Sequence, residues 1–213
     1  MTDQDILTDL QNALMEPPDN GATWPSDLWE KAEVLARMNE RQNRFLKAAL
    51  LHVGMASIPI AANVSTVALP QDWLVTQDVV WTGTASQTVR SLVRADQFQA
   101  DHAHPDWTIT GGVPLVYFDH DQPLLELRIA PTPLEAGTLL LFYIPQGDEV
   151  DGSGMLLSVA DEFADSAVKF GALADLLLKE GRGRSPDRAG YAESRFALGV
   201  EVADLILRSV WVG

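Results

Sequence analysis

The sequence contains no cysteine in its 213 residues, which excludes disulfide cross-links, thiolate zinc sites and a cysteine nucleophile. No run of apolar residues approaches the roughly 18 that a membrane-spanning helix requires. Residues 1–9 are polar and acidic, and they lack the basic segment and apolar run of a secretory signal. We therefore expect a protein that is made in the cytoplasm, works there or in a particle assembled there, and has no membrane partner.

Positive charge is scarce. Lysine and arginine together number 15 against 30 acidic residues, which gives a net charge of −15. Residues 1–26 carry five acids and residues 129–168 carry seven, and neither stretch contains lysine or arginine. Such a chain is not expected to bind duplex DNA, because neutralising phosphates requires a clustered basic surface. The acidity favours solubility; its second interpretation is a surface to which nucleic acid does not adhere.

Apolar residues make up 46% of the chain, enough for a sizeable core, and its N-terminal part has a helical pattern. Thr2 is expected to cap a first helix that ends before Pro17. Ser26 is expected to cap a second helix that runs to about Val53, with Gly54 as its stop. At about 1.5 Å per residue this second helix would span roughly 40 Å.

The C-terminal part is also helical in pattern. A third helix is expected over residues 158–180, with Ser158 at its start and Gly181 at its end. A fourth is expected over residues 185–208, because Ser185 is a good cap and a proline follows at the first helical position. The apolar residues on one side of this fourth helix are Tyr191, Leu198, Val202 and Leu205.

The middle of the chain, residues 58–145, has a period closer to two, which indicates strands. A short helix is expected over residues 94–103, followed by an irregular loop. The last three strands follow one another through short connections and therefore predict an antiparallel meander. The expected strands are 64–69, 75–81, 87–92, 115–120, 124–130 and 138–144.

These patterns predict an α+β fold in which N- and C-terminal helices form one bundle and an antiparallel β-rich lobe is inserted between them. The polar, glycine-rich stretch 146–154 is taken as the boundary after the strands. The expected helical domain comprises residues 1–57 and 155–208, the inserted domain comprises residues 58–154, and residues 209–213 form an apolar tail.

A search for catalytic chemistry finds no constellation, and we assign no catalytic, cofactor-binding or metal-binding residue. His102 and His104 would share a face in a strand, but their spacing matches no standard zinc signature. Ser153 lies between two glycines without the G-x-S-x-G spacing of a hydrolase nucleophile, and it is interpreted as part of a flexible linker.

Arg182, Arg184 and Arg188 form the main basic cluster. Two partners suit it: phosphate groups, or the acidic surface of a neighbouring subunit. Because the rest of the chain is so acidic, we favour the contact between subunits.

The order of several short segments resembles the head-to-tail adaptor, or connector, proteins of tailed bacteriophages, particularly the short-tailed ones. The resemblance covers roughly residues 3–205. Most characteristic are a strand followed by Leu-Pro-x-Asp, and Leu-x-Leu-x-x-x-Pro-x-Pro followed by Gly-x-Leu-x-Leu-x-Tyr. The segments that carry it are Asp5–Leu7, Trp24–Glu30, Val64–Leu74, Leu125–Pro133, Gly137–Tyr143 and Glu162–Leu173.

This resemblance implies a structural virion protein rather than an enzyme. Adaptors of this kind form a ring, commonly of twelve copies, below the portal protein in the neck between capsid and tail. The ring extends the DNA channel used in genome ejection and docks the tail or nozzle protein. The C-terminal segment of such proteins often reaches the portal, which here implies Ser209, Val210, Trp211 and Val212.

Three alternatives stay open at this stage. The first is another virion component, such as a tail-completion or nozzle protein. The second is a metal-dependent hydrolase that uses the His102/His104 loop. The third is a carbohydrate-binding β module, which leaves the helices without a role.

Overall fold

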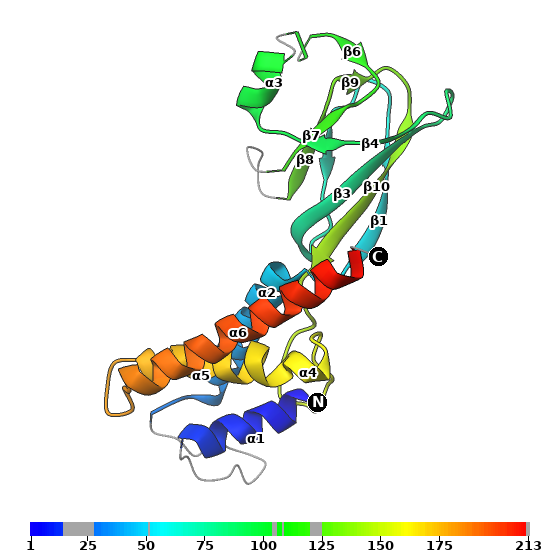
Figure 1. The fold of residues 1–213 in the computed structure, drawn as a ribbon. Helices are drawn as coiled ribbons and strands as arrows, with labels where there is room; N and C mark the ends of the chain where they lie inside the picture. The colour runs from blue at the N-terminus through cyan, green and yellow to red at the C-terminus, as the bar shows by residue number, and fades with distance from the viewer. Residues whose placement is uncertain (15–27, 51, 104–105, 108, 120–124, 212–213) are drawn as a thin grey trace. The chain divides into compact units, whose positions relative to one another are not determined.

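The computed structural model describes residues 1–14, 28–50, 52–103, 106–107, 109–119 and 125–211 (Figure 1). The chain divides into two compact units. The helical unit comprises Met1–His52 together with Gln146–Gly213, and the β unit comprises Val53–Pro145. The α+β class is confirmed: helices from both ends of the chain pack together, and the strands lie in the segment between them.

The helical unit begins with helix α1, Asp3–Leu14. Its start is closed reciprocally, because the Asp5 N–H donates to Thr2 Oγ1 at 3.2 Å and the Thr2 N–H donates to Asp5 Oδ2 at 2.9 Å. This arrangement satisfies two backbone donors that the helix itself leaves unpaired. The predicted role of Thr2 as a cap is confirmed.

Helix α2, Lys31–Ala49, is shorter than predicted. It begins after Glu30, whose backbone is extended, while Ser26 lies outside the described residues. It ends because Leu50 adopts a left-handed conformation, with φ 55° and its N–H bonded to the Leu46 carbonyl. Its 19 residues span about 28 Å instead of 40 Å. Gly54 does not stop the helix; it begins the first strand.

The predicted third helix is one helical run with an irregular middle. Helix α4, Asp161–Ala164, passes through the π-helical turn η1, Asp165–Lys169, into helix α5, Phe170–Leu178. Ser158 does not cap it: the first turn follows Ala160, and the Ser158 hydroxyl accepts the Asp148 N–H at 2.8 Å.

Helix α6, Pro186–Trp211, starts where predicted, with the Ala189 N–H bonded to the Ser185 carbonyl. It continues past Arg208, so the expected tail is wrong in part: residues 209–211 extend the helix. The core beneath α6 is aromatic, since the Phe45 ring lies 5.6 Å from Phe163 and 6.3 Å from Phe196.

The β unit contains two four-stranded sheets. The first has the order β1 (Gly54–Ile60), β10 (Gly137–Pro145), β3 (Trp73–Gly83) and β4 (Val89–Ser91), all antiparallel. The second has the order β2 (Thr66–Ala68), β8 (Glu126–Ala130), β7 (Val116–Phe118) and β5 (Val93–Arg94), the last pair being parallel. The remaining elements are helix α3 (Gln97–Ala103) and the short parallel pair β6 (Gly111–Gly112) and β9 (Thr132–Pro133).

The predicted meander is wrong in its last step. Strands β7 and β8 are antiparallel neighbours, but β10 lies in the first sheet, between β1 and β3. Strand β1, which contains Pro59, is absent from the prediction: the expected second helix runs to about Val53, and the first expected strand begins at residue 64. Proline is tolerated there because β1 is an edge strand, where a missing N–H breaks no ladder on the open side. With β1 present, β10 pairs along both of its sides.

Residues of both sheets form the main core of the β unit. Trp81, on β3, is completely buried. A second, smaller core lies with α3, where the Trp107 ring packs 5.1 Å from Phe118. The main cluster includes Val79, Leu139 and Leu141 from the first sheet and Tyr117, Leu127 and Ile129 from the second.

Candidate interaction surfaces

The described residues contain no group of three or more acidic or histidine side chains placed to hold a metal ion. His102 lies in α3, where its ring stacks on Phe98 with centroids 6.4 Å apart. His102 and His104 were expected to share a face in a strand. His102 lies in a helix instead, where residues two apart do not share a face, so this expectation is wrong for His102. His104 itself is outside the described residues. None of the described helices is long and apolar enough to cross a membrane.

Helix α6 packs on the other helices through its small residues. A side chain added at Gly199 would have its Cβ 2.5 Å from Ser166, so α6 approaches the neighbouring helical run closely. Phe196 is the large exception, and it fills the core beside Phe45. The buried positions of α6 are Ala189, Ala192, Phe196, Gly199 and Ala203.

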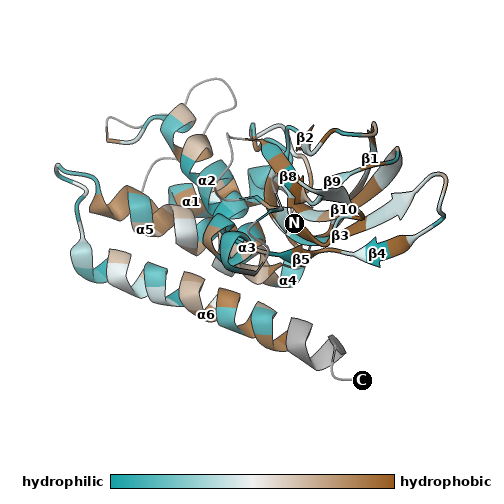
Figure 2. Cartoon of the chain, turned by 90° about the horizontal axis from the view of Figure 1, so that it is seen from above, coloured by the Kyte–Doolittle hydropathy of each residue, from teal (hydrophilic) through white to brown (hydrophobic). Residues whose placement is uncertain are grey.

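The larger apolar residues of α6 are left outside. We call Tyr191, Leu198, Val202 and Leu205 the α6 stripe; each is 40% to 60% exposed. Hydrophobic colour recurs along α6, at the edge of the helical unit, in Figure 2. An amphipathic helix of a globular protein normally turns such residues to the core. Four large side chains exposed in a row make a patch of the order of a few hundred Å², comparable to the largest apolar patch of a typical monomer, which is often functional.

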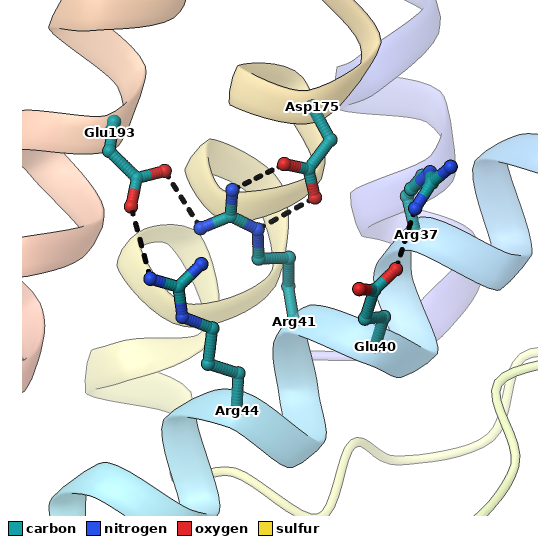
Figure 3. A network of polar contacts seen from close by, with 6 residues as sticks. All are labelled: Arg37, Glu40, Arg41, Arg44, Asp175 and Glu193. Carbon is teal, nitrogen blue, oxygen red and sulfur yellow. Dashed lines mark hydrogen bonds and ion pairs between the residues drawn. The ribbon is translucent and has the colours of Figure 1, made fainter.

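An ion-pair network centred on the buried Arg41 joins α6 to α2 and α5 (Figure 3). The Arg41 guanidinium binds Asp175 through two nitrogens, with Nε 2.7 Å from Oδ2. Its remaining terminal nitrogen lies 2.7 Å from Glu193 Oε2 on α6. The other oxygen of Glu193 lies 3.7 Å from Arg44. One carboxylate of α6 is therefore held by two arginines of α2.

The surroundings of Arg41 suit a buried charge. The hydrogen bond that Arg41 donates to Asp175 raises the pKa of Arg41, and this outweighs the opposite effect of burial. Its guanidinium lies 5.0 Å above the Phe196 ring, a favourable cation–π geometry. Gly171 leaves space for the Arg41 stem, since a Cβ there would be 2.9 Å from it. The network and the small-residue face together fix the rotation of α6, and so turn the stripe outward.

The predicted basic cluster lies around the turn between α5 and α6. Arg182 and Arg184 are exposed, whereas Arg188 donates to the Ala13 carbonyl within the chain. The turn packs closely over Trp29, because Gly183 leaves no room for a side chain beside that ring. Trp29 is held in turn by its Nε1–H, which donates to the Leu176 carbonyl at 3.2 Å. Arg182 and Arg184 thus project from a well-packed turn.

Buried Asp3 organises residues 147–156, which we call the acidic loop. Its carboxylate accepts the Gly152 N–H at 2.7 Å and the Gly154 N–H at 2.8 Å. Asn39 of α2 binds both the N–H and the carbonyl of Val150, at 2.8 Å and 2.9 Å. The prediction of a flexible linker around Ser153 is therefore wrong: hydrogen bonds from α1 and α2 fix this segment.

The acidic loop presents apolar and acidic side chains together. Met155 is 47% exposed and Leu156 is 72% exposed, although the backbone of Leu156 pairs with Thr2. The exposed acids in the same loop are Asp148, Glu149 and Asp151. Sequence reasoning missed Met155 and Leu156; their signal is an apolar pair inside a polar, glycine-rich stretch.

The β unit has an apolar surface of its own. A cavity of about 250 Å³ lies between α3 and strands β5 and β7, with Val93, Ala100 and Trp107 among its lining residues. Phe98 and Ile109 are almost fully exposed on the same unit. These residues were also missed, because single exposed apolar side chains leave no periodic pattern.

The predicted portal-contact residues lie at the C-terminus. Ser209, Val210 and Trp211 belong to the last turn of α6, and Val212 is outside the described residues. Helix α6, which carries the stripe, therefore continues into residues 209–211, the start of the segment that is expected to reach the portal.

Two packed units with exposed apolar surfaces are typical of a subunit that works in an assembly. The sequence matches the family model described as SU10 adaptor protein over residues 1–206. The chain therefore belongs to the SU10 adaptor family, a family of phage head-to-tail adaptors, and it is a structural component of the virion. No curated protein matches the sequence.

Proposed function

We propose that this chain forms a ring below the portal, extends the DNA channel there and docks the tail or nozzle. Membership of the adaptor family supports this place in the virion. The observation that carries the ring is the α6 stripe, whose large side chains face solvent while small ones face the core. A ring subunit requires such lateral surfaces, and copies commonly number twelve in adaptors of this kind. Assembly would take place in the host cytoplasm.

The portal contact is assigned to the C-terminal segment, Ser209–Gly213. This segment is apolar around Trp211, and tryptophan is enriched among residues that anchor interfaces. Residues 209–211 follow the stripe along the same helix, so one element would serve the neighbouring copy and the portal at different points.

The channel wall is proposed to let DNA pass without binding it. The net charge of −15 supports this role, because like charges repel the phosphate backbone. Screening limits the repulsion to about 8 Å at physiological salt, so it acts only on DNA close to the wall.

The test is to mix the purified chain with purified portal and to measure mass by mass photometry, followed by cryo-microscopy. We expect a portal-bound ring of many copies. A chain that binds no portal and forms no ring on it contradicts the proposal. Binding to tail components without portal would instead indicate a tail-completion or nozzle protein.

A further inference from the structure

We propose that the lateral contact between copies is heterologous: the α6 stripe of one copy binds the acidic loop of the next. This inference rests on the proposed function, since it names the partner surfaces within the ring. It commits to a second copy of this chain as the occupant of the stripe. Both surfaces belong to the helical unit, so the inference does not depend on the β unit.

The first support is the apolar match. The stripe provides Tyr191, Leu198, Val202 and Leu205, and the acidic loop provides Met155 and Leu156. Burying both sets against each other removes from water the large apolar side chains that the packing of α6 and of the loop leaves exposed. A standard interface buries about 800 Å² per partner. The stripe alone contributes a few hundred Å² of this, and the residues around it complete the contact.

The second support is charge complementarity. Arg195 lies on α6 between Tyr191 and Leu198, exposed, with its guanidinium 5.4 Å from the Phe170 ring. Arg182 and Arg184 project from the turn that precedes the helix. Opposite them, the acidic loop carries Asp148, Glu149 and Asp151, within a stretch of the sequence, residues 129–168, that has no lysine or arginine. Charges of opposite sign at the rim orient and specify a contact.

The third support is that both surfaces are held in place before they meet. Glu193, bound by Arg41 and Arg44, fixes α6, and Asp3 fixes the acidic loop through two backbone hydrogen bonds. Surfaces that are already ordered lose little conformational entropy on binding. A polar, glycine-containing loop needs such support to present two apolar side chains in a constant position.

The two surfaces are built on different elements. The acidic loop is bonded to α1 and α2, whereas the stripe lies on α6, which packs against α5. When two copies bind through unlike surfaces, one copy keeps a free stripe and the other keeps a free acidic loop, and each can bind a further copy. The assembly therefore grows, and it closes into a ring when the rotation between neighbouring copies permits.

The absence of cysteine allows a direct test by paired cysteine substitution. A Leu156→Cys/Leu198→Cys chain is assembled on purified portal and treated with a short thiol-specific cross-linker. We expect a ladder of two, three and more covalently joined copies. A mixture of the two single variants should stop at pairs. Leu178, exposed at the end of α5, provides the control, since Leu156→Cys/Leu178→Cys should give no ladder.

The outcomes separate this inference from the proposed function. Cross-linking of Leu198→Cys with itself would show that two stripes meet, and cross-linking to portal would show a different occupant; either overturns the inference. The inference is also overturned if the Leu156→Cys/Leu198→Cys chain binds portal but gives no ladder. A chain that does not bind portal or form a ring overturns the proposed function, and the inference with it. The wild-type chain reveals any reaction of the portal's own thiols.

Charge reversal gives a second, independent readout. Arg182→Glu/Arg184→Glu should raise the chain concentration needed to load half of the portal by about tenfold. Adding Asp148→Lys/Glu149→Lys to the same chain should restore most of the loading, because both sides of every contact are then reversed. If the wild-type chain and the two variants load portal equally, the arginines and the acidic loop are not partners in the contact between copies.

Discussion

Arg41 of α2 and Asp175 of α5 are joined through two nitrogens of one guanidinium, with Nε 2.7 Å from Oδ2. Arg41 is buried and Asp175 is partly buried, and Glu193 extends the pair to α6. It thus connects three helices that come from both ends of the chain. The two sequence segments that form the helical unit are separated by the whole β unit, and this connection joins them.

Asp175→Ala is expected to destabilise the helical unit by about 3 kcal/mol, because it leaves Arg41 buried with one carboxylate fewer. Chemical denaturation measures the change. The matched control is Glu40→Ala, which removes the exposed partner of Arg37 on the same helix and should cost about 0.5 kcal/mol or less. If the two substitutions lower the free energy of unfolding equally, the Arg41 network stabilises the protein no more than an exposed ion pair does.

Gly199→Ala is expected to destabilise the protein by about 1–3 kcal/mol through overpacking against Ser166. Gly190→Ala, on the same helix but facing open space, should instead stabilise it by up to about 1 kcal/mol. Thermal unfolding of the two variants provides the comparison. If both stabilise, the close approach of α6 is not as described.

Asp3→Ala is expected to loosen the acidic loop, because two backbone N–H groups lose their acceptor at a cost of about 1–3 kcal/mol. Hydrogen exchange should increase at Gly152 and Gly154. Loading on portal should fall as well, since Met155 and Leu156 lose their fixed position. Asp5→Ala, which removes only the reciprocal bond from the Thr2 N–H at the start of α1, should leave exchange in the loop nearly unchanged.

Deletion of Ser209–Gly213 is expected to weaken portal attachment about tenfold or more, as removal of an aromatic anchor does. The fold should persist, because only the last turn of α6 is shortened. Co-sedimentation with portal measures attachment and circular dichroism checks the fold. A chain lacking only the last two residues tests whether the effect belongs to the 209–211 turn. Unchanged attachment after the full deletion would refute the anchoring role.

The chain should not bind duplex DNA at about 150 mM salt, even near 100 μM, the weak end of non-specific binding. Fluorescence anisotropy with a labelled duplex measures this. Binding that falls steeply with added salt would reveal a basic surface that the charge distribution does not indicate.

Much of the local structure follows from short sequence signals. Thr2 with Asp5, and Ser185 before Pro186, mark helix starts through hydrogen-bonding groups that lie a few residues apart. Alternation of apolar and polar residues located six of the strands. Strand β1 was missed because the second helix was expected to run to about Val53, whereas Leu50 ends it and Gly54 begins the strand.

The sequence by itself determined the α+β class, the order of helices and strands and the acidity, because these depend on composition, spacing and near neighbours. The resemblance to phage head-to-tail adaptors also followed from the sequence alone. Only the tertiary structure decided that α6 would bury Ala189, Ala192, Gly199 and Ala203 and leave the α6 stripe in solvent. It also decided that Asp3 would hold a loop about 150 positions further along the chain. The physical reason is that close packing and long-range hydrogen bonds depend on which segments meet, and no local pattern encodes that.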